Sequence, residues 1–188
     1  GAEEVGLPYE SIEVGGAFGG TQTPEYRQMN PNGLVPVSED HGLPVWESNA
    51  IVRYLSARYA LGTLYPQDPA LRAQSEKWMD WTISSFAVAF RDLFWGVVRT
   101  APADRDAARI DAALVRCGEL LALADAELAR QSWLSGDTFA MGDIPLGAFA
   151  YAWFEMPVQR PELPHLGGWY ARLKQRPAYR SAVMTPLT

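Results

Sequence analysis

The spacing of apolar residues changes part-way along this chain. In the first section, short apolar runs at 9–14, 35–38 and 43–46 predict β-strands, and the turn residues EDHG between the last two predict a hairpin. Helical patterns at 24–29 and 48–60 alternate with these runs. The alternation predicts a small α/β unit.

From residue 70 onward the periodic segments are helical. The longest, 70–99, carries an aromatic-rich stripe, a pattern that marks packed core more often than a ligand pocket. Further helices are predicted over 104–130, 142–155, 166–175 and 177–184. The second section therefore predicts an all-helical bundle.

A proline-containing stretch, LGTLYPQDPA, separates the two patterns. We therefore expect a first domain over 1–61, a linker over 62–69 and an all-helical domain over 70–188. The chain opens with AEEVG, which is typical of the last turn of a helix. Because a domain rarely opens on half a helix, we expect the natural protein to have residues before Gly1.

Composition narrows the classes of function. The 188 residues are 48% hydrophobic and 20% charged, and no apolar run is long enough to span a bilayer. The net charge of -6 opposes binding to a polyanion, since phosphate contacts need clustered Lys and Arg. We expect neither a membrane protein nor a nucleic-acid partner.

Cysteine and histidine usage is sparse. Cys117 is the only cysteine, so no disulfide can form within the chain, and a cytoplasmic location is expected. Its helical spacing predicts a small buried residue rather than a reactive thiol. His41 and His165 lack the spacing of metal ligands and are expected at the surface, so no metal site is predicted.

The candidate chemistry lies in NPNGLVPV and WESNAIVRYL. Pro36 has no N–H for a sheet, and a cis bond before it would leave the Val35 backbone facing outward. Ser48 and the start of a helix can bind a carboxylate, while Glu47 offers a charge for an ammonium group. The alternative is that Ser48 merely caps the helix.

These two motifs, with WYARLKQRPAYRSAV near the end, resemble the cytosolic glutathione S-transferases, in particular bacterial theta-like members. The resemblance implies a thioredoxin-like N-terminal domain, incomplete at its start, followed by a C-terminal helical domain. It implies that the Val35 backbone pairs with the cysteinyl part of glutathione and that Pro36 is cis. It also implies that Glu47 and Ser48 hold the γ-glutamyl end, and that the chain forms a homodimer.

The implied activity is transfer of the glutathione thiolate to a small electrophile, by conjugation or by dehalogenation-type displacement. Glutathione would be the co-substrate. The electrophile pocket is expected between the domains, with Phe90, Phe94 and Trp95 as wall residues. Family members activate the thiol with a Ser, Tyr or Cys that we expect upstream of Gly1, so no catalytic residue is named.

Other functions remain open within the same resemblance. One is glutathione-dependent reduction of disulfides or peroxides. Another is a non-catalytic interaction module, as in elongation factor gamma subunits and stringent starvation proteins. Glutathione binding distinguishes the module from the enzyme.

One departure from the family concerns folding. Relatives commonly begin a late helix with a Ser or Thr cap and an Asp three residues later, whereas this chain has Ala140 and Asp143. We predict that Ala140→Thr raises the free energy of unfolding by ~1 kcal/mol.

Overall fold

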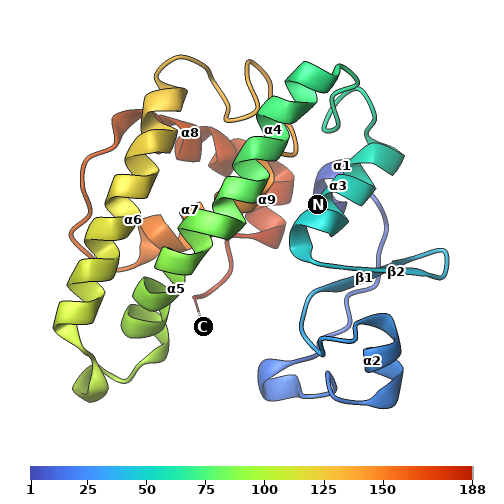
Figure 1. The fold of residues 1–188 in the computed structure, drawn as a ribbon, viewed down its shortest axis with the longest axis horizontal. Helices are drawn as coiled ribbons and strands as arrows, with labels where there is room; N and C mark the ends of the chain where they lie inside the picture. Colours follow the sequence, from blue (N-terminus) through green and yellow to red (C-terminus); the bar gives the residue numbers. More distant parts are fainter. Residues whose placement is uncertain (188) are drawn as a thin grey trace.

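The computed structural model describes residues 1–187. Its N-terminal part contains three helices, a 3-10 turn and one hairpin (Figure 1). These are α1 (Ala2–Val5), η1 (Gly16–Phe18), α2 (Pro24–Met29), β1 (Val37–Asp40), β2 (Leu43–Trp46) and α3 (Ser48–Tyr59).

The hairpin pairs Val37 with Trp46 and Asp40 with Leu43 in an antiparallel register. The predicted strand 35–38 thus begins two residues late, because Pro36 has no N–H to donate to a ladder. His41 lies in the turn with a φ of 51°, a conformation that turns favour. The hairpin itself is confirmed.

The predicted strand 9–14 is wrong. Residues 7–14 are extended but form no strand, and within the described residues β1 pairs with β2 alone. A β-strand is defined by ladder hydrogen bonds, so an extended segment without a partner is not one. Tyr9 and Ile12 are accordingly exposed.

The remaining elements are helical. They are α4 (Pro69–Trp81), η2 (Thr82–Phe86), α5 (Ala87–Phe94), η3 (Trp95–Arg99), η4 (Pro102–Asp104), α6 (Ala107–Leu128), α7 (Asp143–Glu155), α8 (Pro164–Gln175) and α9 (Pro177–Ala182). Both η2 and η3 are π-helical turns, so the predicted helix 70–99 is one helix with two π segments. The predicted helix 104–130 begins later, at Ala107, because Asp106 caps it by accepting the Arg109 N–H at 3.0 Å.

Aromatic side chains fill the core of the helical part. Phe86, Trp153 and Trp169 are among its largest fully buried side chains. Cys117 is also fully buried, and burial raises the pKa of its thiol to about 12. The expectation of a packing residue rather than a reactive thiol is confirmed, since the thiolate is the nucleophile.

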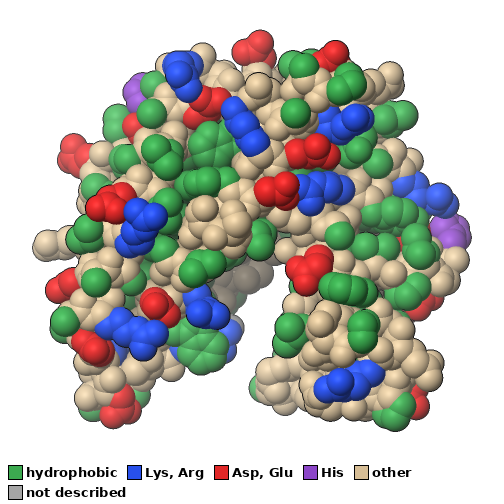
Figure 2. All heavy atoms as spheres, viewed as in Figure 1, with side chains coloured by type: hydrophobic (Ala, Val, Ile, Leu, Met, Phe, Trp, Pro, Cys, Tyr) green, Lys and Arg blue, Asp and Glu red, His purple; other side chains and the backbone are tan. Residues whose placement is uncertain are grey.

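Specific contacts join the two parts. Asn49 of α3 donates its side-chain N–H to the Met79 carbonyl of α4 at 2.7 Å. Arg176, at the junction of α8 and α9, forms two hydrogen bonds with the carboxylate of Glu4, at 3.1 and 2.6 Å. In Figure 1, α3 lies beside α4 and α1 packs against α3 and α9, whereas α2 and the loop next to it lie apart from α5. A notch therefore separates the lower halves of the two parts, which Figure 2 shows as an open hollow.

Candidate functional site

Two buried side chains fix the backbone in front of Val35. Tyr26 and Asn30 each donate a hydrogen bond to the Leu34 carbonyl, both at 2.8 Å. Asn30 also accepts the backbone N–H of Asn32 at 3.0 Å. Because both donors are almost fully buried, this carbonyl is held from inside the domain. The backbone direction at Val35 follows from that anchor.

Val35 itself lies outside the ladder. The Val35–Pro36 peptide bond is cis, which confirms the expectation. Pairing with β2 begins only at Val37, and no hydrogen bond to the Val35 N–H or carbonyl occurs within residues 1–187. The Val35 side chain is 54% exposed. Val35 thus offers one donor and one acceptor to an extended ligand.

Glu47 lies in the turn between β2 and α3 with a φ of 69°, in the left-handed region. A residue with a Cβ is held there at a cost of roughly 1–3 kcal/mol. Its side chain is exposed and makes no capping hydrogen bond. This strained conformation places a carboxylate at the start of α3, where it makes no capping hydrogen bond to the helix.

Ser48 is the first residue of α3, one position after the N-cap, so the interpretation that it merely caps the helix is not the arrangement found. The first backbone bond of the helix runs from the Ile51 N–H to the Glu47 carbonyl at 2.9 Å. Within the described chain, the earlier N–H groups of this turn have no acceptor. They leave the positive end of the helix dipole available to an anion.

Arg27 and Gln22 lie beside the residues that precede Val35. The Arg27 guanidinium bonds to the Gln22 side chain and to the Pro31 carbonyl, and Gln22 donates to the Gly33 carbonyl at 3.3 Å. A Cβ at Gly33 would lie 2.8 Å from the Gln22 amide nitrogen. Gly33 also has a φ of 63°, a conformation that favours glycine, and Arg27 serves this local network.

An apolar cavity of about 490 Å³ lies in the helical part. Phe90, Phe94 and Trp95 all line it, so the structure brings the three predicted wall residues together. Phe90 is 4% exposed and belongs mainly to the core, whereas Trp95 is 59% exposed. The other lining residues are Ala87, Arg91, Ala148, Phe149, Tyr151, Ala152, Val183, Thr185, Pro186 and Leu187.

This cavity differs from the expectation in one respect. Its lining comes from α5, η3, α7 and residues 183–187, all within the helical part, rather than from both parts. In Figure 1, α5 and the last part of the chain border the notch. The cavity therefore forms one wall of the notch, and the N-terminal part faces it across the gap.

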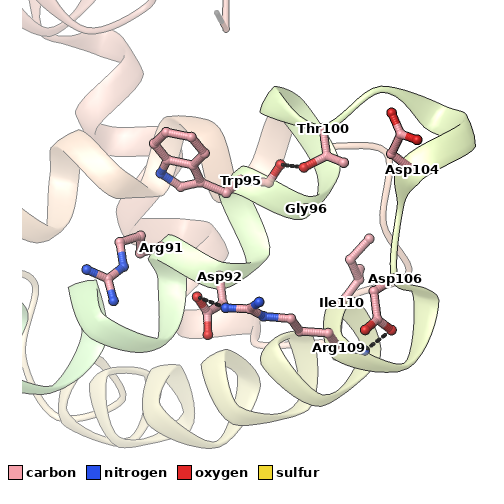
Figure 3. A pocket seen from close by; sticks show the side chains of 9 residues that line it. All are labelled: Arg91, Asp92, Trp95, Gly96, Thr100, Asp104, Asp106, Arg109 and Ile110. Carbon is pink, nitrogen blue, oxygen red and sulfur yellow. Dashed lines mark hydrogen bonds and ion pairs between the residues drawn. The ribbon is translucent and has the colours of Figure 1, made fainter.

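A second cavity, of about 460 Å³, shares Arg91 and Trp95 with the first (Figure 3). An ion pair between Arg109 and Asp92, at 3.0 Å, spans it. In Figure 3 the Trp95 ring and the Arg91 side chain project away from this pair. Trp95 is thus a wall common to both cavities.

Residues 1–187 contain no group of three or more His, Cys, Asp or Glu side chains placed to hold a metal ion. None of the helices in that range is long and apolar enough to cross a membrane.

A cis-proline loop and a hairpin leading into α3, followed by a helical bundle, define the class of thioredoxin-like folds joined to a helical C-terminal domain. Comparison with known families agrees. The family described as "Glutathione S-transferase, N-terminal domain" matches residues 2–57, and "Glutathione S-transferase, C-terminal domain" matches residues 79–177. The chain belongs to the glutathione S-transferase family.

Individual relatives are similar along nearly the whole chain. Glutathione S-transferase GstB of Escherichia coli K12 is 47% identical over 188 residues, 99% of this chain and 90% of the relative. A theta class glutathione S-transferase from Xanthomonas axonopodis pv. citri, solved with glutathione bound, is 68% identical with a TM-score of 0.97, covering 100% of this chain and 90% of that one. Its apo form aligns at 62% identity and a TM-score of 0.88, covering 100% and 89%.

Sequence reasoning missed Tyr26 and Asn30, which hold the Leu34 carbonyl. Tyr26 is the buried residue of α2, and Asn30 is its C-cap. The only signal in the sequence is that Tyr26 lies in the short helix before NPNG and that Asn30 is the first residue of that motif. Their shared target could not be read from the chain, because it lies across a turn.

Proposed function

We propose that this chain is a glutathione S-transferase that binds glutathione along Val35 and transfers its thiolate to a small electrophile. The single observation that carries the proposal is the open Val35 backbone together with the uncapped start of α3. An extended peptide can pair with Val35 by strand addition. Its γ-glutamyl carboxylate then meets the helix start and Ser48, while its ammonium group meets Glu47.

The chemistry needs few groups. The glutathione sulfur, as thiolate, attacks an electrophilic carbon and forms a carbon–sulfur bond, and the leaving group departs with the electron pair of the broken bond. Holding both reactants in the notch supplies the rate advantage of proximity. The cavity lined by Phe90, Phe94 and Trp95 would hold the apolar part of the electrophile.

Calorimetry with glutathione tests the proposal directly. We expect heat of binding for the wild type and an affinity about thirtyfold lower for Glu47→Gln. A matched control is Glu39→Gln, an exposed carboxylate in the middle of β1. If the wild type gives neither heat nor protection from thermal unfolding at millimolar glutathione, the non-catalytic interaction module replaces the enzyme.

We also propose a cytoplasmic homodimer assembled through α3 and α4. Leu71, on α4, is 58% exposed and is a candidate apolar contact. Light scattering on the wild type should give twice the chain mass, and Leu71→Lys should shift it toward the monomer.

The segments 1–61, 62–69 and 70–188 remain our proposal for the domains, and limited proteolysis within 62–69 tests it.

A further inference from the structure

A glycine-rich loop, GGAFGG at residues 15–20, connects the extended segment 7–14 to α2. Phe18 lies at its centre and is 66% exposed. An aromatic side chain in this position buries little apolar surface, so it contributes little to folding. Its residue type is therefore unexplained by the packing of the chain.

The glycines give the loop an easily altered backbone. Gly15, Gly16, Gly19 and Gly20 have φ values of 82°, 51°, 65° and 83°, all in the region that favours glycine. At Gly16 and Gly19 an added Cβ would meet nothing within 4 Å, so packing does not require glycine there. Backbone conformation is what these two positions need.

The base of the loop rests on the proposed ligand-binding strand. A Cβ added at Gly15 would lie 3.3 Å from Cγ1 of Val35 and 3.4 Å from Cγ2 of Thr21. Within the loop, the Phe18 N–H donates to the Gly15 carbonyl at 2.9 Å. This bond closes residues 15–18 into a compact turn. A shift at the base would move the turn as a unit.

The loop also faces the other wall of the notch. In Figure 1 the dark-blue loop lies on the notch side of α2, with α2 on the outer side. Across the notch lie α5 and the end of the chain, which line the apolar cavity. The loop that carries Phe18 and the helices that line the cavity therefore border the same space from opposite sides, and Gly15 places the base of the loop against Val35.

We propose that residues 15–20 form a flap that places Phe18 over the apolar group bonded to the glutathione sulfur. The inference rests on the proposed function. Phe18 is then a specificity-determining residue, and the favoured electrophiles are those with an extended apolar or aromatic body. Small electrophiles do not reach the flap and gain nothing from it.

Two glutathione conjugates test this without requiring turnover. S-hexylglutathione carries a long apolar group, and S-methylglutathione carries the shortest one. Calorimetry should show that Phe18→Ala lowers the affinity for S-hexylglutathione by about fivefold, the effect of one lost aromatic contact. The same variant should bind S-methylglutathione within about twofold of wild type. Phe18→Leu should lie between, and Val115→Ala, an exposed apolar control on α6, should change neither.

The outcomes separate the two proposals. Equal losses for both conjugates, or no loss for either, overturn the role of Phe18. If the wild type binds neither conjugate, the proposed function fails instead. Hydrogen exchange provides a second measurement: amides 15–20 should be protected by S-hexylglutathione but not by S-methylglutathione, and unchanged exchange with both overturns the flap. Circular dichroism confirms that each variant is folded.

Discussion

The starts of α7 and α3 each have a carboxylate beside the first turn of the helix, but the two carboxylates are used in opposite ways. At α7, Asp143 is fully buried and accepts four hydrogen bonds. They come from the Leu134 N–H at 2.8 Å, the Ser135 N–H at 3.3 Å, the Ala140 N–H at 3.3 Å and the Trp169 indole at 2.8 Å. Burial raises the pKa of this carboxyl, and the four donors oppose that rise.

At α3 the carboxylate of Glu47 is exposed and makes no capping bond, on a backbone held at a φ of 69°. The first N–H groups of α7, those of Asp143 and Ile144, donate to the Ala140 and Met141 carbonyls at 3.0 and 3.3 Å, whereas those of α3 are left open. A helix end that serves folding satisfies its groups internally, whereas one that serves a ligand must keep them free. Three of the four predictions below test this contrast, and the other tests the backbone anchor beside Val35.

The largest effect is expected from Asp143→Ala. Removing the carboxylate leaves four buried donors without an acceptor, so the free energy of unfolding should fall by about 4 kcal/mol. Urea denaturation measures it. Asp137→Ala, an exposed change in the preceding loop, is the control and should have little effect. A loss below about 1 kcal/mol would contradict the structural role of Asp143.

Glu47→Gln should act on binding instead. Losing the charge opposite the ligand ammonium should lower the affinity for glutathione by about thirtyfold while leaving the free energy of unfolding unchanged. Glu47→Gly sharpens the test, because glycine relieves the positive φ and should raise the free energy of unfolding by about 1 kcal/mol while also losing affinity. Isothermal calorimetry and thermal unfolding give both quantities. Affinity within twofold of wild type in both variants would show that Glu47 does not bind the ligand.

Asn30→Ala tests the anchor of the binding strand. It removes the bond to the Leu34 carbonyl and two bonds from Asn32, so the free energy of unfolding should fall by about 1.5 kcal/mol. Glutathione affinity should fall as well, because the Val35 backbone is no longer fixed. Asn32→Ala removes only one side-chain bond and should show a smaller change in both measurements. Equal effects of the two variants would count against the anchor.

The smallest effect is expected from Ala140→Thr. The N-cap of α7 is Gly142 rather than Ala140, the position expected from the sequence. The Ala140 N–H already donates to Asp143, and a threonine hydroxyl would add a reciprocal acceptor for the Asp143 N–H, raising the free energy of unfolding by ~1 kcal/mol. The site is 2% exposed, so the added atoms must also fit. Ala140→Val has the same shape without the hydroxyl and is the control. Thermal unfolding showing threonine no better than valine would remove the capping argument.

Local patterns predicted most of the elements correctly. The spacing of apolar residues placed the hairpin and the long helix through 69–99, and the resemblance implied the cis bond at Pro36. The failure at 9–14 has a definite cause. Alternating apolar residues describe a segment that can pair, but pairing depends on a second strand elsewhere in the chain.

By itself the sequence determined the class of protein, because helix and hairpin formation depend on residues close together and because NPNGLVPV and ESNAIVRYL are specific motifs. Only the tertiary structure decided how those motifs are held. Tyr26 and Asn30 converge on one carbonyl, Trp169 reaches Asp143 from 26 residues away, and the aromatic cavity forms where α5 meets α7 and the end of the chain. Such contacts join residues distant in sequence, and their geometry is fixed by packing rather than by local preference.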